Sequence, residues 1–382
     1  MLKSKIFVAF SALALFVSVP LATAAGPLAG MPPVIDSNNI YSEDVANLLS
    51  PTVSKYPSYI YVPNTKSNSV TVIDPITMKV ISTHQVPREP QHVVPSWDLK
   101  TLWVNSDLGN ALTPIDPATG EFGKPVSVND PYNLYFTPDG KYAVVMSEAA
   151  RKIVFRDPHS MAIKREISSQ CLGVNHADWS ADGNTFVVSC EFSGELLLVD
   201  TAKMKILKKQ KIPKGYSAGN TASHNGMPNM GPMPQDVKLS PDGKTFYIAD
   251  MMSDGIWEMP APWGPLQFIK TGRGAHGLYV NRDSKTMLIT NRNEGSISVL
   301  RFSDKKIIAT WQIPGGGSPD MGGISTDGKI FWVSGRYNGV VYAISTVNGQ
   351  LLKKIKVGIG PHGLAVYPQP GRYSLGHTGI FR

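Results

Sequence analysis

Histidine and carboxylate side chains recur at one equivalent position of a long internal repeat. The chain has eight histidines, and four of them fall on the seven such positions. Neutral imidazole is the commonest metal ligand in proteins, and carboxylate oxygen can complete its ligand set. We therefore expect a shared ligand or metal site; the alternative is that these groups satisfy backbone atoms at strand ends. The positions are His92, Asn133, His176, Asp236, His276, Asp320 and His362.

A Gly- and Pro-rich insertion near residues 214–233 holds a second set of candidate ligands. It carries the pattern His-x-x-Met-x-x-Met-x-x-Met, formed by His224, Met227, Met230 and Met233. Thioether sulfur prefers Cu(I), and imidazole binds either oxidation state of copper. The pattern predicts a copper-responsive lid over the four histidines at the repeated position. The alternative is that the methionines fill gaps or cover apolar surface.

Two arginines are candidates for holding an anionic ligand. Arg273 and Arg336 lie near the ends of strands that the repeat predicts, either the innermost strand of a unit or the strand that follows it. A guanidinium there could bind a carboxylate or phosphate through two parallel hydrogen bonds, whereas a surface arginine needs no ligand. The sequence has no G-x-S-x-G, H-E-x-x-H, Walker-type or G-x-G-x-x-G element in a suitable context. We therefore identify no catalytic residue from the sequence.

The elements that must position these residues are short strands that begin at intervals of about 42 residues. Most of them follow a turn such as Pro138-Asp139-Gly140, in which Asp-Gly supplies the positive φ of a tight hairpin. Four strands in about 40–45 residues are typical of one β-propeller blade. The count predicts an all-β fold with seven blades. The first strands start at Tyr59, Thr101, Tyr142, Thr185, Thr245, Thr286 and Ile330.

The two ends of the repeat region predict how the ring closes. The first unit, which starts at Tyr59–Asn64, lacks an inner strand, and an unclaimed inner strand occurs at Gly363–Tyr367. Pairing these segments would leave no open sheet edge. We therefore expect an N-terminal arm at residues 25–56, a seven-bladed propeller at 57–372 that is closed by a C-terminal inner strand, and a tail at 373–382.

Several segments resemble a known family of repeats. Tyr61–Asn64 (YVPN) and Asn68–Asp74 (NSVTVID) resemble the YVTN-type β-propeller repeat of secreted and periplasmic bacterial proteins, and Pro361–Val366 (PHGLAV) resembles its inner-strand signature. The resemblance covers residues 59–372 and implies the fold rather than a particular function. The chain is more distantly similar to the haem-binding propeller domain of periplasmic nitrite reductases. It departs from that domain in its blade count and in having no C-x-x-C-H motif.

The N-terminus has the pattern of an export signal. Lys3 and Lys5 precede an apolar run, and Ala22-Thr23-Ala24 fits a cleavage site, which predicts a signal peptide at residues 1–24. No later segment is apolar enough to span a membrane. We expect a periplasmic or secreted protein. In such a compartment Cys171 and Cys190 could pair, and the sequence leaves open whether they do.

The net charge of +8 is modest for 382 residues, and no basic run supports nucleic-acid binding. We expect a monomeric binding propeller with a small ligand, metal or protein partner at the channel mouth. Copper and haem are the candidate cofactors. The alternatives are a propeller enzyme, such as a lactonase-like hydrolase or a lyase, that uses a channel metal or a His/Asp acid-base pair, and a protein-interaction scaffold or haem-handling propeller.

Overall fold

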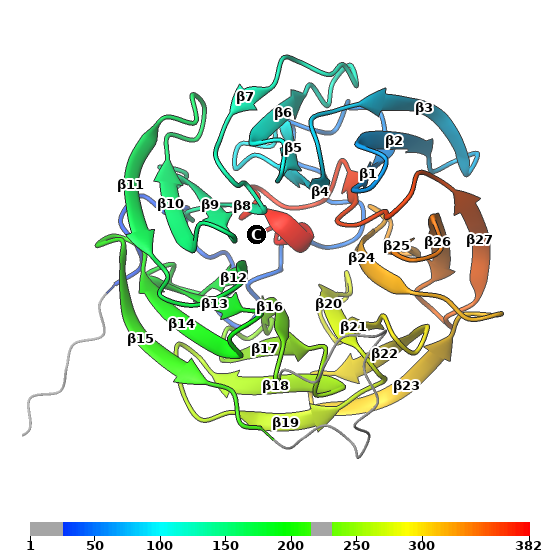
Figure 1. Cartoon of the computed structure of the whole chain (residues 1–382). Coiled ribbons are helices and arrows are strands. Elements are labelled where there is room, and N and C mark those ends of the chain that lie inside the picture. The colour runs from blue at the N-terminus through cyan, green and yellow to red at the C-terminus, as the bar shows by residue number, and fades with distance from the viewer. Residues whose placement is uncertain (1–25, 215–230) are drawn as a thin grey trace, which may run out of the picture.

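The computed structural model describes residues 26–214 and 231–382, which form a seven-bladed β-propeller (Figure 1). Each blade is a four-stranded antiparallel sheet whose innermost strand lines the centre of the ring. The prediction of an all-β, seven-bladed propeller is therefore confirmed. The predicted signal peptide lies outside the described residues.

The strands follow one another from the inner to the outer edge of each blade. Blade 1 contains β28 (Ala365–Tyr367), β1 (Tyr59–Asn64), β2 (Ser69–Asp74) and β3 (Lys79–Gln85). Blade 2 contains β4 (Pro90–Pro95), β5 (Leu102–Ser106), β6 (Ala111–Ile115) and β7 (Val126–Ser127). Blade 3 contains β8 (Asn133–Phe136), β9 (Ala143–Ser147), β10 (Lys152–Arg156) and β11 (Ile163–Ser168). Blade 4 contains β12 (Val174–Trp179), β13 (Thr185–Cys190), β14 (Glu195–Asp200) and β15 (Lys205–Lys211). Blade 5 contains β16 (Pro234–Leu239), β17 (Thr245–Asp250), β18 (Gly255–Pro260) and β19 (Gln267–Lys270). Blade 6 contains β20 (Ala275–Val280), β21 (Thr286–Asn291), β22 (Ser296–Arg301) and β23 (Lys306–Gln312). Blade 7 contains β24 (Pro319–Ile324), β25 (Ile330–Gly335), β26 (Val340–Ser345) and β27 (Leu351–Lys356).

The apolar core lies between neighbouring blades. The three inner strands of a blade are almost entirely buried, as in β12, β13 and β14, whereas the outer strand β15 is mostly exposed. Between blades 3 and 4, the Phe186 ring lies 6.3 Å from Phe155 and 4.7 Å from Trp179. Because both faces of each inner sheet are covered, β-branched and aromatic residues fill these strands almost continuously.

The ring closes as the sequence predicts. Strand β28 pairs with β1 in antiparallel register, with Tyr59 opposite Tyr367 and Ile60 opposite Val366. This pairing supplies the inner strand that the first blade lacks. The N- and C-terminal parts of the chain thus share one sheet, and blade 1 has no free inner edge.

The two faces of the ring differ in what covers them. The turns that connect the inner strand of each blade to the next strand, such as the turn between β12 and β13, lie on one face. Residues 26–56 run across this face. The backbone N–H groups of Leu28, Ile40 and Asn47 donate to turn carbonyls of blades 4, 5 and 7 over 2.8, 2.8 and 2.9 Å. We call this the arm face. The opposite face, here the mouth face, carries the loops that lead into the inner strands.

The C-terminal tail turns into the central channel (Figure 1). Leu375 N–H donates to the Ile380 carbonyl over 2.8 Å, so the tail forms a narrow loop with the 3-10 turn η1 (His377–Gly379) at its tip. Arg382 anchors the end of this loop by donating to Asp178 Oδ1 over 2.9 Å. Residues 26–214 and 231–382 contain no helix with the length and apolar character needed to cross a membrane.

Cys171 and Cys190 form a disulfide with their Cα atoms 6.0 Å apart. Cys190 ends β13, where it lies opposite Val174 of β12. The bond therefore fastens the loop that leads into β12 to the neighbouring strand of the same blade. His176 lies on β12, two residues beyond Val174, so the bond braces the strand that carries one of the candidate ligands.

Candidate metal centre

The four histidines predicted to share a site form a closed ring around the channel. Adjacent ring centroids are 4.7 Å apart for His92 and His362, and 6.0 Å apart for His362 and His276. The remaining separations are 6.3 Å between His276 and His176, and 6.0 Å between His176 and His92. All four side chains are buried. Four blades thus bring their imidazoles into mutual contact.

A fifth histidine comes from the C-terminal tail. The ring centroid of His377 lies 3.9 Å from that of His92 and 5.2 Å from that of His176. Its neighbour Gly376 has φ 116°, and a Cβ there would meet the backbone of Leu134 and Tyr135 at 2.6 Å. Glycine therefore allows the tip of the tail to reach the histidine ring.

Asp320 connects two of the histidines with two arginines. Its carboxylate lies 3.2 Å from Nδ1 of His276 and 3.5 Å from Nε2 of His362. Each carboxylate oxygen also faces an arginine, with Nε of Arg292 3.1 Å from Oδ1 and Nε of Arg336 3.8 Å from Oδ2. Burial raises the pKa of Asp320, and the two guanidinium groups oppose that rise. One ligand atom each from His276, Asp320 and His362 lie within 4.8 Å of one another, which suits a single metal ion.

Burial keeps the imidazoles in the form that binds metal. Loss of solvation lowers the pKa of all five histidines, to about 3 for His176. Neutral imidazole is the ligand form. Moreover, Nδ1 of His362 lies 3.0 Å from Oε1 of Gln91, which can accept a hydrogen bond from Nδ1–H and so leave Nε2 free to coordinate.

His92 is the least satisfied of these side chains. It is fully buried, and in the described parts of the chain neither of its ring nitrogens has a hydrogen-bond partner. A buried polar group without a partner costs roughly 1–3 kcal/mol. A Cβ at Gly363 would overlap Nδ1 of His92, so the closing strand leaves this imidazole just enough room.

The other predicted positions have local roles. Asp236 accepts hydrogen bonds over 2.9 Å from Val237 N–H of its own strand and from Leu278 N–H of the next blade. Asn133 lies beside His176, with Nδ2 3.4 Å from Nδ1. Through these contacts both residues link the inner strands of neighbouring blades. Arg273 is exposed and its backbone N–H donates to Glu294, whereas Arg336 reaches the centre through Asp320.

The predicted copper lid can be followed only at one end. His224, Met227 and Met230 lie outside the described residues. Met233, which precedes β16, is buried in a small cluster with Met251 and Met252, which follow β17 of blade 5. The Met233 side chain therefore has apolar neighbours of its own. Cu(I) binding by this insertion stays a prediction.

A haem group does not fit among these imidazoles. The tip of the tail fills the centre of the ring, with His377 against His92 and His176. A planar macrocycle inserted at this level would have to displace the tail. A single ion needs no such space, and a set of imidazoles with one carboxylate suits zinc, copper, nickel or iron.

The sequence analysis missed three kinds of residue at this centre. His377 lies outside the repeat, so periodicity could not point to it. Arg292 could have been found, because it directly follows the second strand of blade 6 as Arg336 does in blade 7. The same position holds carboxylates in blades 2, 3 and 4, which are Asp107, Glu148 and Glu191.

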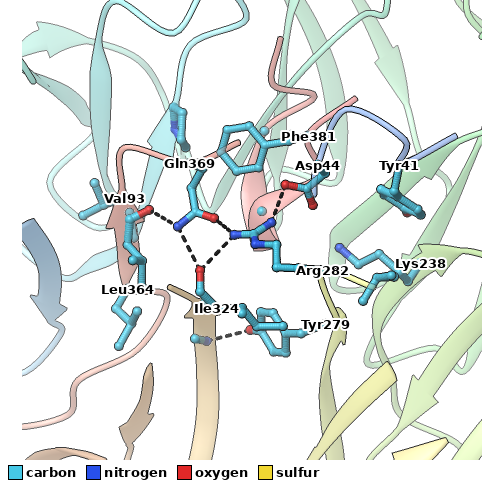
Figure 2. Close-up of a pocket in the computed structure, with 18 residues that line it drawn as sticks. Tyr41, Asp44, Val93, Lys238, Tyr279, Arg282, Ile324, Leu364, Gln369 and Phe381 are labelled. Atoms are coloured by element: carbon cyan, nitrogen blue, oxygen red, sulfur yellow. Dashed lines mark hydrogen bonds and ion pairs between the residues drawn. The ribbon is translucent and has the colours of Figure 1, made fainter. Parts of the chain in front are cut away.

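A separate pocket is lined by Tyr41 and Asp44 of the arm together with Arg282, Gln369 and Phe381 (Figure 2). Arg282 donates to Asp44 of the arm, to Gln369 and, over 2.9 Å, to the carbonyl of Ile324. Gln369 donates to the same carbonyl over 3.0 Å. Burial raises the pKa of Asp44 to about 7. This network connects the arm to the segment that follows β28, so the channel is covered at the arm face.

The sequence matches the family model for YNCE-like beta-propellers over residues 19–370. Protein YncE of Salmonella typhi is 20% identical over 293 residues, which cover 70% of this chain and 75% of that protein. YncE of Salmonella typhimurium matches equally well.

Two solved structures are similar in fold. A chain of Kuenenia stuttgartiensis hydrazine synthase has a TM-score of 0.62 at 18% identity, covering 75% of this chain and 92% of its own. The dihydro-heme d1 dehydrogenase NirN, in complex with DHE, has a TM-score of 0.58 at 12% identity, covering 81% and 75%. At such identities the likeness concerns the propeller fold alone.

Proposed function

We propose that this chain, which belongs to the YncE-like β-propeller family, is an exported binding protein that holds a transition-metal ion among its channel histidines. The observation that carries the proposal is the buried ring of His92, His176, His276 and His362 beside Asp320. The strongest single sign is His92, whose two ring nitrogens lack partners in the described residues. A bound cation would satisfy such a group.

The donor set indicates which ions to test. His276, Asp320 and His362 provide two nitrogens and one oxygen, and His92 adjoins His362 as a further nitrogen donor. Nitrogen-rich sites of this type bind Cu(II) more tightly than Zn(II), by the usual order of affinities. The ligands lie on the inner strands of blades 2, 6 and 7 and on the segment that leads into the closing strand β28.

The deciding experiment is a competition titration of the purified, metal-free mature chain with Cu(II) and with Zn(II) against a chelator. We expect one ion per chain, bound more tightly for copper. The double variant His276→Ala, His362→Ala should lose this binding, and the exposed-residue variant His159→Ala should keep it. Binding by the double variant as tight as that of the parent would contradict the proposal. A bound ion that keeps an exchangeable water would favour the enzyme alternative.

The export part of the proposal rests on the N-terminal sequence pattern. We expect expression of the full chain in a bacterium to deliver a product to the periplasm whose first residue is Ala25. Fractionation followed by N-terminal sequencing measures this directly. A cytoplasmic product that still begins at Met1 would contradict it.

A further inference from the structure

The mouth of the channel carries charges that are unequally distributed around the ring. The residue that directly follows the second strand of each blade lies at this face, and it differs from blade to blade. Blades 2, 3 and 4 contribute carboxylates, and blades 6 and 7 contribute arginines. One side of the mouth is therefore acidic and the opposite side basic. In blade order the residues are Thr65, Asp107, Glu148, Glu191, Met251, Arg292 and Arg336.

The basic side contains a cavity. It has a volume of about 520 Å³ and lies between the loops of blades 6, 7 and 1. Lys66, Arg292, Arg336 and Lys356 all line it, together with residues 337–339 and 357–360, and no carboxylate is among its lining residues in the described parts of the chain. Cavities of about 300–1,000 Å³ have the size of small-molecule sites.

The two arginines keep hydrogen-bonding capacity for a ligand. Each directs Nε towards Asp320, and the Nη1 atoms make only long contacts, of 3.4 Å to the Tyr337 hydroxyl and 3.4 Å to the Gly360 carbonyl. In residues 26–214 and 231–382 no contact uses Nη2 of either arginine. A guanidinium has five N–H donors, and its fork matches carboxylates and oxyanions.

We propose that this cavity binds a small multivalent anion, an oxyanion or a polycarboxylate, and that Asp320 couples the anion to the metal ion. The anion site is inferred from the cavity and its four cationic side chains. The coupling to the metal ion rests on the proposed function. Asp320 faces both arginines and both His276 and His362. A cation that draws the carboxylate towards the histidines weakens its hold on Arg292 and Arg336. The arginines then have more of their charge and donors available for the anion.

Sulfate is a suitable probe, because it stays divalent over the whole neutral range and binds transition metals weakly. Calorimetric titration of the metal-free mature chain, at constant ionic strength set with chloride, should reveal one site. Arg336→Gln and Lys356→Gln should each weaken sulfate binding about tenfold. The matched control Arg165→Gln, an exposed arginine on β11, should bind as the parent does. Absence of binding beyond the chloride baseline, or binding by both cavity variants as tight as that of the parent, would overturn the anion site. Lys356 is exposed, so its variant tests the site even if Arg336→Gln folds poorly.

The same titration on metal-loaded protein tests the coupling. Sulfate should bind more tightly when the metal is present, and sulfate should tighten metal binding by the same factor, because linkage is reciprocal. Equal sulfate affinities with and without metal would overturn the coupling and leave the anion site standing. A chain that binds sulfate but no metal would refute the proposed function and support the cavity.

Discussion

The hydrogen bond between Gln91 and His362 determines which nitrogen of that imidazole faces the centre. Oε1 of Gln91 accepts a hydrogen bond from Nδ1–H of His362. The free lone pair of the imidazole therefore lies on Nε2, towards Asp320. Partners that orient ligating histidines typically change metal affinity by about 10–100-fold when removed. We expect Gln91→Leu to weaken metal binding by at least about tenfold. Gln91→Glu retains an acceptor and should restore most of the affinity.

Chelator competition measures both affinities, with Gln267→Leu, at an exposed position of β19, as the control. Because Gln91 is a positioning residue, the comparison of the leucine and glutamate variants is the informative one. A merely structural role would make both variants equally weak. That result would remove Gln91 from the account of the site.

The crowded carboxylates at the acidic side of the mouth predict a pH dependence of stability. Burial raises the pKa of Asp107 from 3.8 to about 8 and that of Glu148 from 4.5 to about 9, and neighbouring carboxylates add to both shifts. The fold therefore favours their protonated forms. Their contribution to stability is complete below pH 4 and is lost as pH rises through 8–9. The free energy of unfolding should thus decline as pH rises from about 7 to 9, a range in which the buried histidines are neutral in both the folded and the unfolded chain.

Denaturant unfolding of the metal-free chain at several pH values measures this decline. Asp107→Asn and Glu148→Gln should each flatten it, since an amide cannot titrate. Asp304→Asn is the control, because hydrogen bonds from Arg301 lower the pKa of Asp304 and its own contribution changes only in acid. A profile that stays equally steep in both mouth variants would show that other groups cause the decline.

Residues within the repeat could be predicted from the sequence, and residues outside it could not. Periodicity alone located His92, His176, His276 and His362, because each occupies the same place in a blade. The same periodicity also selected Asp236, which instead accepts backbone hydrogen bonds from two strands. The equivalent position of a blade can hold either a side chain that binds backbone groups or one that faces the channel, and the sequence does not distinguish them. His377 has no counterpart in any blade, so only three-dimensional structure reveals it.

At the scale of single elements, the disulfide fastens a loop that the strand pattern leaves open. The bond between Cys171 and Cys190 closes a short loop beside His176 on β12. Disulfides typically stabilise a fold by about 2–4 kcal/mol. We expect the double variant Cys171→Ala, Cys190→Ala to lose stability in this range, and its metal affinity to fall because β12 is less firmly held. Denaturant unfolding and metal titration of the oxidised parent and the double variant measure the two effects. Equal stability of the two proteins would show that the strand pairing alone holds this loop.

For the whole molecule, the number of blades and the closing strand followed from strand spacing, whereas the contents of the channel did not. Each blade repeats the same local pattern, so the count depends only on the chain itself. The tail and the arm meet the ring through contacts without a period, such as Arg382 with Asp178 and Asp44 with Arg282. Such contacts depend on how distant segments meet in space.

Closure by β28 makes the stability of the whole ring depend on its last strand. Removing residues 361–382 would expose the inner edge of β1 and uncover Ile60, which packs with Val366 and Trp332 between blades 1 and 7. Open edges and an uncovered apolar face favour association between chains. We expect this truncation to aggregate or to lose cooperative unfolding.

A shorter truncation, of residues 373–382, keeps β28 and is the matched control. It should remain a folded monomer with weakened metal binding, because it lacks His377 and the anchor Arg382. Size-exclusion chromatography and thermal unfolding followed by circular dichroism distinguish the two chains. If the longer truncation is soluble and unfolds in one cooperative transition like the shorter one, the pairing of β28 with β1 does not hold the ring together.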